Sequence, residues 1–207
     1  RRQPEVVLPA SVSASSLIVA QHDVGAFVAQ LVRPMPRVTG REAGVGTRFH
    51  AWLEKKFGVA ALLDIDELDP EPPEADLADS ELVFRRLTVA FERGRYAERK
   101  PACIEEPFIL VLDGQQVRGR IDAVFVTPDD PLHDYQVVDW KTSNRPADPL
   151  QLALYRLAWA RSVGVPVNRV DAVFYHVLSD EVERPPNLLD EPELVALLWS
   201  LSRRSDG

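Results

Sequence analysis

Two short stretches decide the fold class of this chain: Gly119-Arg120-Ile121-Asp122 and, across a short loop, Val137-Val138-Asp139-Trp140-Lys141. Side chains of a β-strand alternate between its two faces, so Asp139 and Lys141 are predicted to point the same way. Trp140 then faces the opposite side. The two consecutive valines before Asp139 are typical of a strand that is buried on both faces.

The preceding strand brings a second carboxylate beside this pair. Alternation puts Val117, Gly119, Ile121, Ala123 and Phe125 on one face, and Arg118, Arg120 and Asp122 on the other. A carboxylate in a buried sheet must be paired, hydrogen-bonded or bound to a cation. Lys141 can neutralise one of the two acids, and a hard cation such as Mg²⁺ can balance the other. Such a group can aim water at a phosphodiester, which suggests a nuclease.

Two alternatives stay open at this point. Asp139 and Lys141 can mark a solvated strand end, because Asp-x-Lys is a frequent pattern. Asp122 can instead be paired with an arginine of its own face, Arg118 or Arg120.

Length and composition predict one domain. With 207 residues and 45% hydrophobic content, the chain can bury one substantial core and is too short for two catalytic domains. We expect an extended tail over residues 1–14 and a single domain over 15–207. The only methionine is Met35 and the chain opens on two arginines, so we expect a C-terminal fragment of a larger protein.

Cysteine content and hydropathy exclude several classes. The single cysteine, Cys103, excludes an internal disulfide and any cluster of cysteine ligands. No apolar run approaches the roughly 18 residues that a membrane span needs, and no signal peptide is recognisable. We therefore expect a cytoplasmic protein without a membrane partner.

The net charge of −8 argues against a strongly basic nucleic-acid surface, but the charge is unevenly distributed. Much of the acid lies in residues 60–78, where prolines are interleaved with it, and this segment is predicted to be a solvated loop. Basic residues gather in two local groups that could serve DNA: Arg33, Arg37 and Arg41, and Arg93, Arg95, Arg99 and Lys100.

Periodicity and turn residues predict an ordered series of elements. Helices are expected from Ser15 or Ser16 to residue 31, over 46–57, from residues 79–80 to 93, over 148–163, and from residue 191. Strands are expected over 103–112, 116–126, 134–141 and 169–178, the first two joined by a hairpin turn at Asp113-Gly114. The order predicts an α/β fold, in which helices pack on both sides of a mixed sheet.

The core order, αβββαβ with extra N-terminal helices, is that of the restriction-endonuclease-like fold. The chain resembles the nuclease domain of the RecB family, in the PD-(D/E)XK superfamily, which lies at the C-terminus of bacterial helicase–nucleases, actinobacterial ones among them. The resemblance rests on five motifs in the family's order: residues 46–54, Glu105-Glu106-Pro107-Phe108, residues 119–122, residues 138–142, and Gln151-Leu152-Ala153-Leu154-Tyr155. Residues 13–17 and 33–36 add a looser similarity.

The resemblance implies a metal site and its chemistry. Its ligands would be His50, Asp122, Asp139 and the backbone carbonyl of Trp140, with Glu106 as a further candidate. Lys141 would orient or help deprotonate the attacking water, acting with Asp139 and Asp122. The cofactor would be Mg²⁺ or Mn²⁺, and the imidazole of His50 favours Mn²⁺. Some relatives bind an iron–sulfur cluster through four cysteines, but with Cys103 alone we expect none here.

Alternatives remain for several of these residues. His50 lies on the apolar stripe of its helix and can be a core histidine. Gln151 and Tyr155, four apart on one helix face, are candidate DNA-binding residues together with Arg120. Gln151 also stands three residues after Asp148, which is a capping-box arrangement, and Tyr155 can be a packing residue.

Two functions follow from this pattern. The first is a metal-dependent DNA nuclease, with exonuclease activity expected, that serves DNA-end processing and repair. It would work with upstream helicase domains of the same polypeptide, and with a second helicase–nuclease subunit as a further partner. The second is a nuclease-like module that docks or guides DNA and cuts it poorly. The joint presence of His50, Asp122, Asp139 and Lys141 favours the first.

Overall fold

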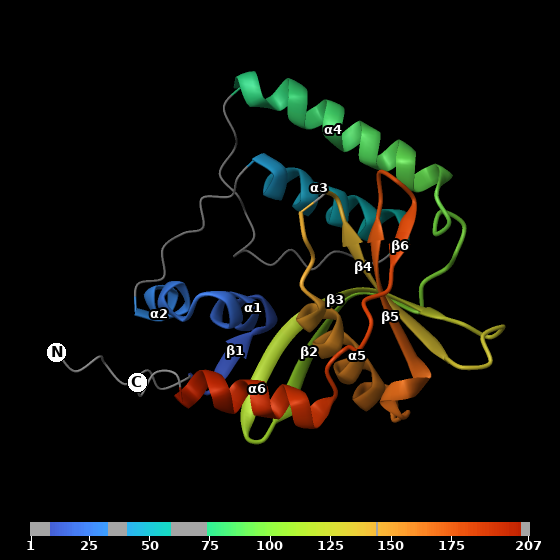
Figure 1. Cartoon of the computed structure of the whole chain (residues 1–207). Coiled ribbons are helices and arrows are strands. Elements are labelled where there is room, and N and C mark those ends of the chain that lie inside the picture. Colours follow the sequence, from blue (N-terminus) through green and yellow to red (C-terminus); the bar gives the residue numbers. More distant parts are fainter. Residues whose placement is uncertain (1–8, 33–40, 59–73, 144, 204–207) are drawn as a thin grey trace.

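A six-stranded mixed sheet forms the centre of the molecule, with helices on both of its faces (Figure 1). The computed structural model describes residues 9–32, 41–58, 74–143 and 145–203. The strands are β1 (Ser11–Ser13), β2 (Cys103–Leu112), β3 (Gln115–Val126), β4 (Tyr135–Lys141), β5 (Val170–His176) and β6 (Glu181–Glu183). The helices are α1 (Ala14–His22), α2 (Val24–Val32), α3 (Arg41–Lys56), α4 (Glu74–Arg93), α5 (Pro149–Val163), the short 3₁₀ helix η2 (Val167–Arg169) and α6 (Glu191–Arg203).

The strand order is β1-β3-β4-β5-β6, and β2 pairs with β3 beside this path. Strands β2 and β3 are antiparallel, as are β3 and β4, whereas β4 and β5 are parallel. Helix α5 is the crossover that two parallel strands require. The predicted mixed α/β fold is therefore confirmed, with the order α4, β2, β3, β4, α5, β5.

The turn between β2 and β3 is the predicted hairpin. It joins Leu112 to Gln115, and Asp113 and Gly114 have φ angles of 47° and 83°. Two central residues with positive φ match the right-handed twist of the flanking strands, which is why Asp-Gly is favoured there.

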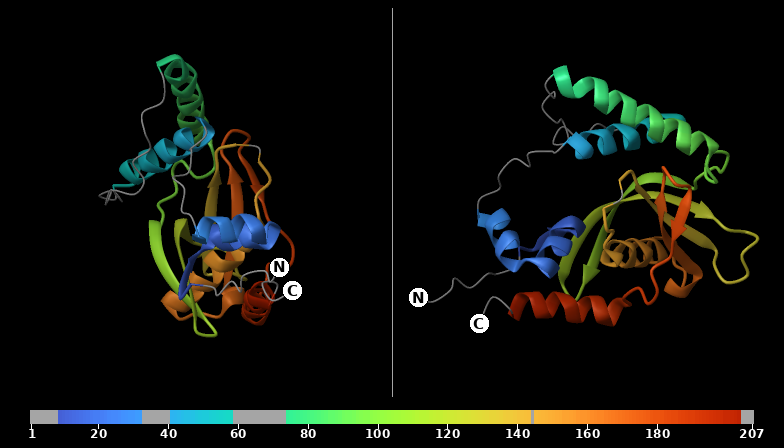
Figure 2. Two further views of the ribbon diagram at one scale, coloured as in Figure 1. Left: turned by 90° about the vertical axis from the view of Figure 1, so that its left-hand side faces the viewer. Right: turned by 45° about the horizontal axis from the view of Figure 1, so that its top comes forward.

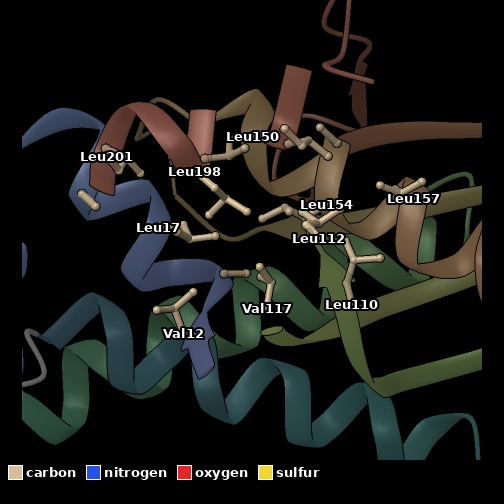
Figure 3. Close-up of a cluster of buried hydrophobic side chains, with 14 of the residues drawn as sticks. Val12, Leu17, Leu110, Leu112, Val117, Leu150, Leu154, Leu157, Leu198 and Leu201 are labelled. Carbon is tan, nitrogen blue, oxygen red and sulfur yellow. The ribbon is translucent and has the colours of Figure 1, made fainter. Parts of the chain in front are cut away.

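Each face of the sheet has its own helical cover (Figure 2). Helices α3 and α4 bury Phe49, Leu53 and Phe91 against one face, next to an aromatic group that includes Trp140 and Tyr175. Helices α1, α5 and α6 cover the other face. Figure 3 shows the apolar cluster under them, which contains the buried side chains Val12, Leu17, Leu110, Leu112, Val117, Leu150, Leu154, Leu157, Leu198 and Leu201.

The N-terminal part differs from the prediction. Within the segment expected to be an extended tail, residues 11–13 form strand β1, which pairs in parallel with residues 116–118 and buries Val12. Ser13, rather than Ser15 or Ser16, caps α1 by accepting a hydrogen bond from the Ser16 N–H. The single helix expected up to residue 31 is divided, because Asp23 ends α1 and its side chain accepts from the Ala26 N–H to begin α2.

Other boundaries also shift. Helix α3 begins at Arg41 rather than residue 46, and α4 begins at Glu74, inside the loop predicted over 60–78. Strand β6 was not predicted. Several predicted features lie outside the described residues: most of the predicted tail, residues 59–73, Arg33 and Arg37. None of the described helices is long and apolar enough to cross a membrane.

The simple alternation predicted for β3 fails near its middle. Ile121 and Val124 belong to one apolar cluster beside α5, whereas Ala123 and Phe125 belong to the cluster on the opposite face. The shift coincides with Glu105 on β2, which has a left-handed φ of 49° and falls between the rungs that pair Ile104 with Ala123 and Glu106 with Ile121. The hairpin is therefore kinked at Glu105 and Asp122.

One tight junction ties the end of α4 to the turn after β5. Asp180 accepts hydrogen bonds from the Arg95 N–H at 3.0 Å and from the Tyr175 hydroxyl at 2.7 Å. Gly94 lies directly beside this group, and a Cβ atom at that position would come within 2.1 Å of the Tyr175 hydroxyl oxygen. The contact requires glycine there.

Candidate metal centre

The candidate site lies where β3 and β4 stop pairing. Their last regular rung joins Ala123 to Val138. Beyond it, the backbone N–H of Trp140 donates to the Asp122 carboxylate at 2.9 Å instead of to a backbone carbonyl. Asp122 and Asp139 are both buried, at 7% and 2% exposure. The end of regular pairing thus coincides with two buried carboxylates, one on each strand.

His50 approaches these carboxylates from α3. Phe49 and Leu53 anchor the helix in the core, which leaves the imidazole directed at the acids. Its Nδ1 lies 2.7 Å from Glu105 Oε1, and its Nε2 lies 3.8 Å from Asp122 Oδ2. His50, Glu105 and Asp122 each offer one ligand atom, and these atoms lie within 4.8 Å of one another. The sequence-predicted pair His50 and Asp122 is brought together.

Glu105, not Glu106, is the acid of β2 that faces the site. Glu106 is exposed, whereas the Glu105 side chain is only 12% exposed and contacts His50. Counting back by twos from the buried side chains Leu112 and Leu110 leads to Glu106. The left-handed backbone of Glu105 breaks that count, and nothing in the residue pattern signals it.

Asp139 and Lys141 share one face of β4, as predicted. Lys141 Nζ lies 2.6 Å from Asp139 Oδ2, an ion pair without hydrogen-bond geometry. Asp139 lies outside the group formed by His50, Glu105 and Asp122. Its buried Oδ2 is therefore partnered by the Lys141 ammonium group alone among the described residues.

Lys141 is held from α5 by a short relay. It donates to Gln151 Oε1 at 3.1 Å, and Gln151 Nε2 donates to the Tyr155 hydroxyl at 2.9 Å. Asp148 is the N-cap of α5, as predicted, and accepts from the Leu150 N–H. The Gln151 side chain bonds to Lys141 and Tyr155 and so belongs to the site, whereas the helix cap is provided by Asp148. Tyr155 is buried and also packs edge-on against Phe108.

Burial and mutual repulsion shift the acid pKa values strongly. Burial, followed by the nearby Asp122 charge, raises the pKa of Asp139 to about 7, although Lys141 opposes the shift. Burial also raises the pKa of Asp122 to about 6, opposed by His50. Burial of the His50 ring disfavours its cation, but Asp122 and Glu105 outweigh this and raise its pKa to about 9. The site concentrates negative charge that a cation would offset.

A family comparison identifies this arrangement. The PD-(D/E)XK nuclease superfamily matches residues 26–198, which is most of the chain and includes every site residue above. The chain belongs to the PD-(D/E)XK nuclease superfamily. Its mixed sheet with helices on both faces is accordingly a restriction-endonuclease-like fold.

Part of the chain is also similar to the Gene 69 proteins of two phages. It is 48% identical over 66 residues to that of Mycobacterium phage L5 and 47% identical over 62 residues to that of Mycobacterium phage D29. These segments are 32% and 30% of this chain, and 21% and 22% of the phage proteins, so the similarity spans about a fifth of their length. The crystal structure of SSO0001 is 14% identical, with a TM-score of 0.42, over 95% of this chain and 76% of that chain.

Membership of this superfamily makes a divalent metal the expected cofactor, and the residues present fit one. The donor set combines carboxylate oxygens with one imidazole, which suits Mg²⁺ or Mn²⁺. The buried carboxylates of Asp122 and Asp139 repel one another, and burial raises both of their pKa values, so a cation held by these residues would offset their charge. The indole of Trp140 packs among the aromatic side chains of the opposite face, so only its backbone lies at the site.

Proposed function

We propose that this chain is a divalent-metal-dependent nuclease that hydrolyses phosphodiester bonds in DNA. The observation that carries the proposal is the convergence of His50, Asp122 and Asp139 with Lys141 at the break between β3 and β4. Membership of the PD-(D/E)XK nuclease superfamily supports the same reaction. Three buried or half-buried acids grouped with one lysine are typical of a functional site, and a purely structural role does not explain them.

The proposed ligands are His50, Asp122 and Asp139, with the Trp140 carbonyl beside them. Glu105, rather than Glu106, is the acid of β2 that contacts this group, through His50. When bound, a divalent cation lowers the pKa of a water molecule and offsets the negative charge that develops on the phosphate. We propose that both Mg²⁺ and Mn²⁺ support the reaction, and that the imidazole makes Mn²⁺ at least as effective.

The remaining residues would orient the reactants. Lys141, fixed between Asp139 and Gln151, would donate hydrogen bonds to the attacking water or to a phosphate oxygen. Gln151 keeps the ammonium group in place and Tyr155 supports Gln151. Arg120, half-buried on β3 two residues before Asp122, is proposed to contact the DNA backbone.

The biological setting is proposed from the resemblance to RecB-family domains. In that setting the chain would process DNA ends as an exonuclease, joined to helicase domains or working with a second helicase–nuclease subunit. Cleavage of linear DNA with circular DNA of the same sequence left intact would support an exonuclease. Cutting of the circle would refute that part.

The decisive test is cleavage of linear DNA by the purified chain with Mg²⁺, Mn²⁺ or EDTA. We expect cleavage with either metal and none with EDTA, and loss of cleavage in Asp139→Ala and Lys141→Ala. Matched controls are Asp129→Ala and Lys55→Ala, which alter exposed residues and should cut like the parent. A chain that binds DNA but never cuts it would establish the docking module instead.

A further inference from the structure

We infer that Glu105 is a positioning residue, whose carboxylate holds the His50 ring so that its Nε2 faces the metal. The inference rests on the proposed metal-dependent function, and deepens it by giving a role to Glu105, an acid of a motif in which only Glu106 was expected to reach the metal. It concerns the orientation of one ligand rather than the chemical step itself.

The first observation is the division of the two imidazole nitrogens. Nδ1 lies 2.7 Å from Glu105 Oε1, within hydrogen-bond distance. Nε2 lies 3.8 Å from Asp122 Oδ2, which is too long for a hydrogen bond. A carboxylate can only accept, so the proton of this hydrogen bond belongs to Nδ1. The lone pair of a neutral ring is then on Nε2, on the side of Asp122.

The second observation is the backbone of Glu105. Its φ of 49° lies in the left-handed region, which a side chain as long as glutamate seldom adopts. The conformation turns Glu105 toward His50 at the one position of β2 that lies opposite Asp122. Strained backbone of this kind persists where the surrounding structure fixes it, and it is concentrated at functional sites.

The third observation is burial. The Glu105 and His50 side chains are 12% and 27% exposed, while the adjacent Glu106 is exposed. Burying a carboxylate costs free energy relative to leaving it in solvent, unless a partner such as His50 compensates for it. Carboxylates that bind the second nitrogen of a metal-ligating histidine fix its tautomer and ring orientation, and their loss typically weakens metal affinity about 10- to 100-fold.

The competing role is direct ligation, since Glu105 offers an oxygen within the same 4.8 Å group. The two roles differ in what glutamine can replace. The Glu105→Gln side chain keeps an oxygen that can accept from Nδ1 but loses the charge that a direct ligand supplies. Rescue by glutamine therefore indicates positioning.

The test measures Mn²⁺ binding to the whole chain by calorimetry, and the coupling of bound Mn²⁺ to a histidine nitrogen by pulsed electron paramagnetic resonance. Glu105→Gln should bind within about threefold of the parent and keep the nitrogen coupling. Glu105→Ala should bind about 10- to 100-fold more weakly and lose or reduce that coupling. Glu105→Gly should behave like Glu105→Ala although glycine suits the backbone, and Glu106→Gln is the exposed control.

Two results would overturn the inference. One is a parent protein whose bound Mn²⁺ shows no histidine nitrogen. The other is equal loss of affinity in Glu105→Gln and Glu105→Ala with the nitrogen coupling intact, which would make Glu105 a ligand. Failure of the proposed function looks different, because the parent would then bind Mn²⁺ through His50 and still leave DNA uncut.

Discussion

The backbone N–H of Trp140 on β4 donates a hydrogen bond of 2.9 Å to the side chain of Asp122 on β3. A side chain thus replaces the backbone carbonyl that a regular antiparallel ladder would supply at this point. Asp122 consequently has two tasks, one in the sheet and one in the proposed metal site, and substitutions can separate them.

Asparagine and alanine at position 122 should have different effects on folding. Asp122→Asn keeps an acceptor for the Trp140 N–H and removes a charge that burial disfavours, so the metal-free variant should be at least as stable as the parent. Asp122→Ala leaves that N–H unpaired, at a cost of about 1–3 kcal/mol in the free energy of unfolding. Urea unfolding without metal measures both. Neither variant should cut DNA, and cleavage by Asp122→Asn at the parental rate would remove Asp122 from the site.

Lys141 should matter for cleavage and not for metal affinity. Its ammonium contacts Asp139 and Gln151, so Lys141→Met removes the group that would act on the water or phosphate while leaving every proposed ligand. We expect cleavage to fall about 100-fold or more. Mn²⁺ affinity by calorimetry should stay within about threefold, and a loss of affinity equal to the loss of cleavage would show a structural role instead.

The stability of the metal-free chain should fall as pH rises. In the folded state the pKa values are about 6 for Asp122, about 7 for Asp139 and about 9 for His50, all raised above their ordinary values of 3.8, 3.8 and 6.5. Each group therefore binds its proton more tightly when folded. The stability that it contributes is fully present below its ordinary pKa and is lost as pH rises through its folded pKa.

Metal should reverse this trend, because ligands bind a cation in their deprotonated forms. The rise in Tm caused by Mn²⁺ should accordingly be larger at about pH 8 than at about pH 5.5. Differential scanning calorimetry with Mn²⁺ or EDTA at the two pH values measures it. An equal or larger rise at the lower pH would contradict the assigned ligand set.

Much of the site was predictable, since it depends on local patterns. Alternation along one strand correctly placed Asp139 and Lys141 on the same face, and Asp148 and Pro149 correctly marked the start of α5. The hairpin at Asp113 and Gly114 follows from the φ angles that such a turn needs. These features are determined by neighbours in the sequence.

The rest depends on tertiary contacts that local patterns do not contain. The left-handed backbone of Glu105 accompanies its contact with His50 on a distant helix, whereas the family resemblance had indicated Glu106. Strand β1 is only three residues long and exists because it pairs with β3. Helix α1 ends at Asp23 through a cap inside an otherwise continuous apolar pattern.

The relay from Lys141 through Gln151 to Tyr155 should act as one unit. Burial, together with the nearby Asp122 and Asp139 carboxylates, raises the pKa of Tyr155 well above its ordinary value, so its hydroxyl stays protonated. Gln151→Ala should lower kcat about 10- to 100-fold, and Tyr155→Phe by less. The double variant should be no worse than Gln151→Ala alone. Multiplying effects in steady-state kinetics would show that the two residues act separately.

Gly94→Ala should destabilise the fold without touching the chemistry. The added Cβ would lie 2.1 Å from the Tyr175 hydroxyl oxygen, so Tyr175 or the end of α4 must move. We expect a loss of about 1–3 kcal/mol in the free energy of unfolding. Gly114→Ala is the comparison, because a Cβ at Gly114 meets nothing within 4 Å although φ there is 83°. It therefore separates the effect of backbone strain from that of a clash. Cleavage per folded molecule should stay at the parental value in both.

The kink at Glu105 also has a meaning for sequence variation among relatives. A left-handed position is one where selection for stability alone would favour glycine or asparagine over glutamate. Retaining glutamate there has a stability cost, which the hydrogen bond with the histidine beside it offsets. Homologues that lost the histidine should therefore drift to glycine or asparagine at this position, and the two positions should vary together. The residues found at positions 50 and 105 would then indicate which relatives still maintain the site.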